Sequence, residues 1–141
     1  MAVTDKAADD LDPRRLHLPE LHELPRGGLR FEYDRPSDTM YVDFYGKALP
    51  AVSVPVDRGD RDYLYLRVDP ETKRVVGLQI EAFLAYATKQ EPYLLAAAFL
   101  AQLRGFTDIE IAQLRRAIGE SVARRGWDEA AFLHQIGVRI A

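Results

Sequence analysis

Hydrophobic and polar residues alternate along residues 29–80, which is the pattern of β-strands. Every second residue from Met40 to Phe44 is apolar, and a period of two recurs over residues 63–69 and 74–80. Successive side chains of a strand point to opposite faces, so this period gives one apolar face and one mixed face. Such a division is typical of an antiparallel sheet covered on one side. The stretch therefore predicts a run of antiparallel hairpins.

Prolines mark the turns and one edge of this predicted sheet. Pro36 and Pro70 preset φ for the second position of a turn, and an aspartate shortly before each can cap the turn's amides. Residues 51–56 form a further predicted strand between Pro50 and Pro55. Because proline cannot donate a hydrogen bond to a neighbouring strand, we expect this strand at the sheet edge.

Beyond residue 80 the apolar residues follow helical periods. Residues 81–89 predict a short helix, and residues 93–103 are apolar on nearly every side, which indicates a helix buried in the protein or at an interface. The Thr-x-x-Glu spacing at 107–110 is that of a capping box, and Asp128 can cap a last helix. The fold class that follows is α+β. We predict an antiparallel meander of four or five strands, followed by three or four C-terminal helices packed on one face.

The chain before the sheet predicts a tail and an arm. Residues 1–28 contain three prolines, which prevent a long helix, and we expect residues 1–10 to be disordered. Residues 11–24 contain too many leucines for a solvated tail, so they predict an arm that docks on the body or on a partner subunit. Residues 29–141 then form a single domain, with the sheet over 29–80 and the helices over 81–141.

Part of the sheet resembles a known family. The residues that carry the resemblance are Tyr33, Asp34, Asp38, the strand 40–44, Val68, Asp69 and the strand 75–80. They resemble a small bacterial family catalogued as domain of unknown function 2283, although Gln79 stands where that family often has an acid. The resemblance covers about residues 30–85. It implies a compact β-rich module and no particular activity.

Composition removes several classes of function. The 141 residues include no cysteine, so disulfides, thiolate metal sites and cysteine nucleophiles are excluded. A net charge of −3 argues against a dedicated nucleic-acid-binding protein, which is usually basic. No apolar run reaches the roughly 20 residues of a membrane span, and the N-terminus lacks the pattern of a secretion signal. We therefore expect a cytoplasmic protein that binds neither nucleic acid nor membrane.

The candidate metal ligands lack the usual spacing. His17 and His22 are five residues apart with Pro19 between them, whereas a zinc-protease helix needs two histidines four apart on one face. The aspartates of the loop 57–62 are interleaved with arginines and do not follow the calcium-loop pattern. We predict no bound metal and no cofactor.

Carboxylates gather near the first predicted turn. Tyr33, Asp34, Asp38, Asp43 and Glu81 could converge at one end of the sheet, where carboxylates can bind a ligand or carry out acid–base chemistry. Capping of the turn is the simpler explanation for Asp34 and Asp38. We therefore assign no catalytic residue and treat Tyr33, Asp34, Asp38 and Asp43 as candidates for ligand binding.

The leading function predicted from the sequence is a non-catalytic interaction module that self-associates. The apolar helix over 93–103 offers more apolar surface than one sheet face can cover, and pairing of two subunits is the commonest way to bury it. We predict a homodimer with Leu95, Phe99 and Leu103 at the interface. The sequence identifies no other protein partner. The alternative is a small-ligand-binding protein or an enzyme that uses the Tyr33, Asp34 and Asp38 end of the sheet.

Overall fold

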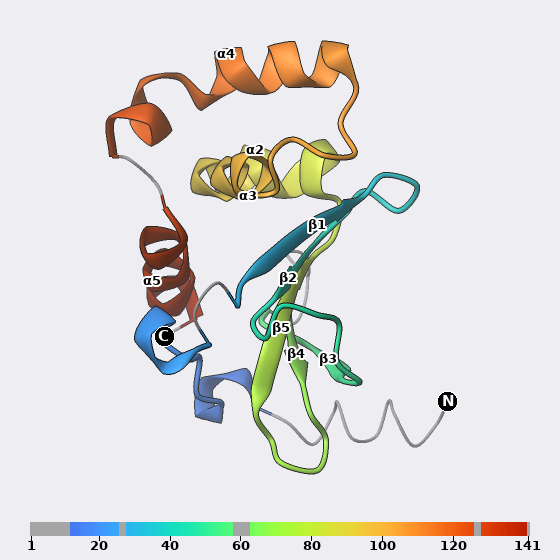
Figure 1. Cartoon of the computed structure of the whole chain (residues 1–141), viewed down its shortest axis with the longest axis vertical. Coiled ribbons are helices and arrows are strands. Elements are labelled where there is room, and N and C mark those ends of the chain that lie inside the picture. The colour runs from blue at the N-terminus through green and yellow to red at the C-terminus, as the bar shows by residue number, and fades with distance from the viewer. Residues whose placement is uncertain (1–11, 26–27, 58–62, 126–127, 141) are drawn as a thin grey trace.

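The computed structural model describes residues 12–25, 28–57, 63–125 and 128–140 (Figure 1). It contains a five-stranded antiparallel sheet followed by helices, which confirms the predicted α+β class. The strands are β1 (Arg30–Asp34), β2 (Thr39–Asp43), β3 (Val52–Pro55), β4 (Leu64–Val68) and β5 (Val75–Ile80).

The strands lie in the order β1-β2-β5-β4-β3, with every neighbouring pair antiparallel. The hairpin β1–β2 and the unit β3–β4–β5 are therefore joined through β2 and β5. As the flanking prolines predict, β3 lies at one edge. The other edge is β1, which leads directly into the turn before β2.

The two faces of the sheet differ as the period of two predicts. One central row on the covered face is apolar and buried, and consists of Phe31, Val42, Leu78, Leu66 and Val54. Phe31 meets Phe132 of the last helix, α5 (Glu129–Ile140), edge to face, with ring centroids 5.5 Å apart. The opposite face is mixed, and one of its rows consists of Glu32, Tyr41, Gln79 and Tyr65. The helices therefore pack on the apolar face, where burial contributes most.

The helical part begins with an irregular stretch and ends with two longer helices. Its elements are a π-helix η3 (Phe83–Ala87), α2 (Thr88–Gln90), a 3₁₀ helix η4 (Pro92–Leu95), α3 (Ala96–Leu100), α4 (Asp108–Arg125) and α5 (Glu129–Ile140). Figure 1 shows α4 across the top of the view, α2 and α3 beneath it, and α5 beside the sheet. None of the helices in the described parts of the chain is long and apolar enough to span a bilayer.

The prediction of one continuous helix over 93–103 is wrong. The chain forms η4 and then only five residues of α3, after which Gln102 and Leu103 have φ of 58° and 57°. A left-handed conformation costs about 1 to 2 kcal/mol at a residue other than glycine. The turn brings Phe106 back onto the sheet, where it is only 9% exposed and stacks on Tyr33. Burial of this aromatic ring offsets the cost of the turn.

Local hydrogen bonds confirm both helix starts that the sequence predicts. The amide of Glu110 donates to Thr107 Oγ1 at 3.2 Å, and the amide of Thr107 donates to Glu110 Oε1 at 2.8 Å. The amide of Ala131 donates to Asp128 Oδ1 at 2.9 Å. Caps of this kind fix where α4 and α5 begin, and each contributes about 1 kcal/mol.

Leucines of the N-terminal arm lie against the body. It contains two 3₁₀ turns, η1 (Pro13–Arg15) and η2 (Leu21–Glu23). Leu24 is buried, and Leu16, Leu18 and Leu21 pack against the core while staying partly exposed. The predicted tail over residues 1–10 lies outside the described residues.

Candidate ligand-binding site

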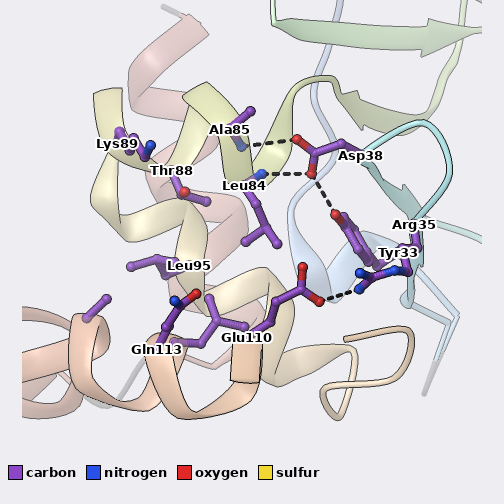
Figure 2. Close-up of a pocket in the computed structure, with 12 residues that line it drawn as sticks. Tyr33, Arg35, Asp38, Leu84, Ala85, Thr88, Lys89, Leu95, Glu110 and Gln113 are labelled. Carbon is purple, nitrogen blue, oxygen red and sulfur yellow. Dashed lines mark hydrogen bonds and ion pairs between the residues drawn. The ribbon is translucent and has the colours of Figure 1, made fainter. Parts of the chain in front are cut away.

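The turn between β1 and β2 places Asp38 at the start of the π-helix. The backbone oxygen of Asp38 accepts the amide of Phe83 at 2.8 Å. Its carboxylate accepts the amides of Leu84 and Ala85 at 2.9 and 3.0 Å (Figure 2). The first amides of a helix have no partner within the helix, so Asp38 supplies acceptors that the backbone lacks. The role expected for Asp38 was turn capping, whereas the structure shows it capping a helix 45 or more positions along the chain.

The π-helix itself is an unusual element. Ala82 precedes it with φ of 47°, and its oxygen accepts the amides of both Tyr86 and Ala87 at 2.8 Å. Bonds from residue i to i+5 are rare and occur frequently at functional sites. A left-handed alanine persists only where the surroundings determine its conformation. Here the hydrogen bonds to Asp38 determine it, so the backbone of this helix is held in one place.

Tyr33 connects the same carboxylate to the core. Its hydroxyl donates to Asp38 Oδ1 at 2.6 Å, and its ring stacks on Phe106 with centroids 4.2 Å apart. The loop after α3 passes close to this tyrosine, because a Cβ atom at Gly105 would lie 3.1 Å from the Tyr33 backbone oxygen. Burial, followed by the hydrogen bond to Asp38, raises the pKa of Tyr33 well above its ordinary value. The phenol is therefore a fixed hydrogen-bond donor at neutral pH.

Helix α4 completes the site from the other side. Glu110, in its first turn, forms an ion pair with Arg35 of the β1–β2 turn. The amide of Thr107, followed by Arg35, lowers the pKa of the Glu110 carboxyl. This ion pair connects two segments that are 75 positions apart in the sequence.

These elements line a cavity of about 600 Å³ that is open to solvent. Pockets for small ligands usually have volumes of about 300 to 1,000 Å³ and combine apolar walls with a few placed polar groups. Figure 2 shows the side chains of the β1–β2 turn, the π-helix, α2 and α4 around this space. The lining consists of Tyr33, Arg35, Asp38, Leu84, Ala85, Thr88, Lys89, Leu95, Glu110, Gln113, Leu114 and Ala117.

The structure brings together two of the four residues predicted to bind a ligand. Tyr33 and Asp38 line the cavity. Asp34 is exposed and its carboxylate accepts the Ser37 hydroxyl within the turn, not a turn amide as expected. Asp43 lies on the opposite face of the sheet, where burial raises its pKa and Arg30 Nη1 donates to it at 3.2 Å. Neither Asp34 nor Asp43 lines this cavity.

Sequence reasoning missed the residues that α2 and α4 contribute. Thr88, Lys89 and Gln113 carry no motif, and their nearness to the hairpin depends on the irregular path between β5 and α4. The capping-box spacing of Glu110 predicts where a helix starts, but it does not predict the ion pair with Arg35. No sequence spacing could have predicted that ion pair.

A second cavity, of about 710 Å³, lies between the arm and α5. Its walls are mainly apolar, and its charged or titratable side chains, Glu20, His22 and His134, are all exposed. The first cavity instead contains polar groups that the fold fixes: Tyr33 is 9% exposed and Thr88 is 7% exposed. We therefore take the first cavity as the candidate site.

One group of potential metal ligands occurs in the described parts of the chain. Ligand atoms of Glu20, His22 and Glu23 lie within 4.8 Å of one another, and all three residues are exposed. Each carboxylate already has a histidine beside it: His22 Nδ1 is 3.2 Å from Glu20 Oε2, and His17 Nε2 is 3.1 Å from Glu23 Oε2. Glu23 Oε1 also accepts the amide of Glu20 at 3.1 Å. Surface pairing and capping explain the group, and the absence of a bound metal stays a prediction.

The residues predicted to form a dimer interface are largely covered within one chain. Leu95 is only 7% exposed, and Phe99 and Leu103 pack against the core while keeping part of their surface. Helix α3 contacts β1 and α5, and η4 contacts α4. The apolar stretch over 93–103 therefore finds most of its partners inside the subunit. The homodimer stays a prediction.

Comparison with protein families, curated proteins and solved structures finds no match to this chain. The resemblance to domain of unknown function 2283 therefore stays a prediction, and the function has to be argued from the site.

Proposed function

We propose that this chain is a non-catalytic binding protein that takes one small ligand into the cavity between the β1–β2 turn and helices α2 and α4. The observation that carries the proposal is the cavity of about 600 Å³ whose lining includes the fixed group Tyr33–Asp38. Groups that are positioned before binding lower the entropic cost of holding a ligand.

Binding, as opposed to catalysis, is supported by how these groups are already used. Asp38 accepts two backbone amides and one phenol, so its carboxylate is committed to the fold. The pKa of Tyr33 is raised, which makes its phenol a poor base or nucleophile at neutral pH. Glu110 is likewise engaged by Arg35 and by the Thr107 amide. An acid–base pair would need at least one carboxylate free to exchange a proton with a substrate.

The test uses a neutral fluorescent probe and two tryptophan variants of the full chain. N-phenyl-1-naphthylamine fluoresces when it enters an apolar site, and we expect it to bind with saturation. Ala85→Trp fills the cavity from the π-helix side, so it should abolish most of the signal. Ala112→Trp, on the exposed surface of α4 and outside the cavity lining, is the matched control and should bind as the parent does. Equal binding by both variants would contradict the proposal.

Self-association is a second candidate function. The observation that favours it is that Phe99 and Leu103 keep part of their side chains in solvent. Sedimentation at micromolar concentration tests it, because a single species of 16.0 kDa would exclude the dimer. In a dimer, Phe99→Asp should dissociate the subunits, whereas Leu95→Asp should unfold each subunit because Leu95 is buried within it.

We also propose a cytoplasmic location. It is supported by the absence of cysteine from the 141-residue sequence, which fits a reducing compartment.

A further inference from the structure

We infer that the ligand of this cavity is an amphipathic organic anion, with an apolar body and a carboxylate-like group that binds at Lys89. The inference rests on the proposed function and adds the chemical class of the ligand. It depends on which of the charged groups in the lining already have partners in the fold.

Four charged side chains line the cavity, and their formal charges cancel. Three of them already have hydrogen-bond or ion-pair partners in the fold. Arg35 and Glu110 neutralise each other in an ion pair. Asp38 accepts the Tyr33 hydroxyl at 2.6 Å and two backbone amides, so donors surround its charge. The charge on Lys89 is the remaining one.

Lys89 takes part in none of the ion pairs between residues that the structure describes. It extends from α2 next to Thr88, whereas Arg35 lies on the hairpin side of the space (Figure 2). Among the charged side chains of the lining, Lys89 is therefore the one with neither an ion-pair partner nor a hydrogen-bond partner in the described residues, and it lies at the α2 end. A ligand with a negative group at that end gains an ion pair without breaking one that exists.

The rest of the lining selects for an apolar body. Leu84, Leu95 and Leu114 are the large apolar side chains of the lining, and Leu114 is only 4% exposed. Ala85 and Ala117 keep the space open because their side chains are small. An organic acid that places its chain or ring on this wall buries apolar surface, worth about 25 cal/mol for each Å² removed from water. The ligand class is therefore an anion joined to an apolar group, not a sugar or a polyphosphate.

The experiment compares a charged and a neutral probe on the full chain. 8-Anilinonaphthalene-1-sulfonate carries one negative charge on an aromatic body, and N-phenyl-1-naphthylamine has a similar body without the charge. Lys89→Gln should weaken the sulfonate probe about fivefold, the size expected for one exposed ion pair, and leave the neutral probe unchanged. Lys47→Gln removes the same charge from an exposed position outside the cavity lining and should change neither.

A second, independent experiment measures competition for the sulfonate probe by three aliphatic compounds of the same chain length. Decanoate should displace the sulfonate probe at lower concentration than decanol, and decylamine should be the weakest of the three. The inference is overturned if Lys89→Gln leaves sulfonate binding unchanged, or if decylamine competes as well as decanoate. Those results leave the proposed function intact as long as Ala85→Trp still blocks the neutral probe. If Ala85→Trp has no effect on that probe, the proposed function fails as well.

Discussion

Two tyrosines of this protein, Tyr33 and Tyr63, each donate a hydrogen bond to a half-buried carboxylate, Asp38 and Glu91. Both phenols are nearly buried, at 9% and 3% exposure, and burial is the main reason that the pKa of each is raised. The pairs differ in what else the carboxylate binds. The Asp38 carboxylate also accepts two backbone amides, whereas the Glu91 carboxylate also accepts Arg139 Nε at 2.8 Å.

That difference decides what each pair can do. Arg139 also forms an ion pair with Asp57, so its guanidinium connects α5 to the segments after β3 and before η4. This second group, called here the C-terminal cluster, uses its cation to hold distant segments together. The pair at Asp38 needs no cation, so a positive charge in the cavity lining stays available to a ligand. Backbone capping is thus compatible with a binding site, and a closed ion-pair network is better suited to fixing the fold.

Removal of the Asp38 carboxylate should have the largest effect on stability. Asp38→Ala leaves the amides of Leu84 and Ala85 and the Tyr33 hydroxyl without their acceptor. We expect a loss of about 3 kcal/mol in the free energy of unfolding, measured by urea denaturation. Asp34→Ala removes a neighbouring exposed carboxylate and should change it by no more than about 0.5 kcal/mol. Equal effects of the two variants would show that Asp38 is only a turn residue.

Loss of Arg139 should have a smaller effect that depends on salt. Arg139→Met leaves Glu91 and Asp57 without their shared cation, and we expect a loss of about 2 kcal/mol at low ionic strength. The loss should shrink at 1 M salt for Arg139→Met but not for Asp38→Ala, because salt screens ion pairs more than backbone caps. Arg116→Met, at an exposed position of α4, is the control. A salt-independent loss would contradict the role given to this cluster.

The phenol hydroxyls should contribute least, about 1 kcal/mol each, as Tyr33→Phe and Tyr63→Phe measure by the same denaturation assay. The dependence of stability on alkaline pH tests Tyr63 in particular, because burial and Glu91 raise the pKa of its phenol to about 12 from an ordinary 10.0. As pH rises, the phenol loses its proton in the unfolded chain before it does so in the folded protein. Its contribution to folding stability is therefore complete below about pH 10 and is lost as pH rises toward about 12. In Tyr63→Phe the free energy of unfolding should therefore fall less steeply between about pH 10 and about pH 12. If it falls as steeply as in the parent protein, Tyr63 does not cause the alkaline loss of stability.

Local patterns account for what the sequence could predict. The strands follow from a period of two, and the start of α4 follows from the spacing of Thr107 and Glu110, because these signals involve neighbours in the chain. The edge position of β3 follows from its two prolines. The burial of Leu24 follows from the leucine content of the arm.

The rest depends on contacts between distant segments. Asp38 meets the amide of Ala85 and Arg139 meets Asp57, at separations of 47 and 82 positions. The early end of α3 reflects the packing of Phe106 on Tyr33, which overrides the helical pattern of residues 93–103. Tertiary contacts of this kind leave no trace in the spacing of residues.

Amide chemical shifts measured by NMR locate the ligand, which we expect in the cavity beside Asp38. Titration of the isotope-labelled full chain with N-phenyl-1-naphthylamine should move the amide signals of Leu84, Ala85 and Gln113, which line the cavity. The amides of His134 and Gly137, which line the second cavity, should stay in place. Shifts confined to His134, Gly137 and the arm would place the ligand between the arm and α5 and would rule out binding beside Asp38.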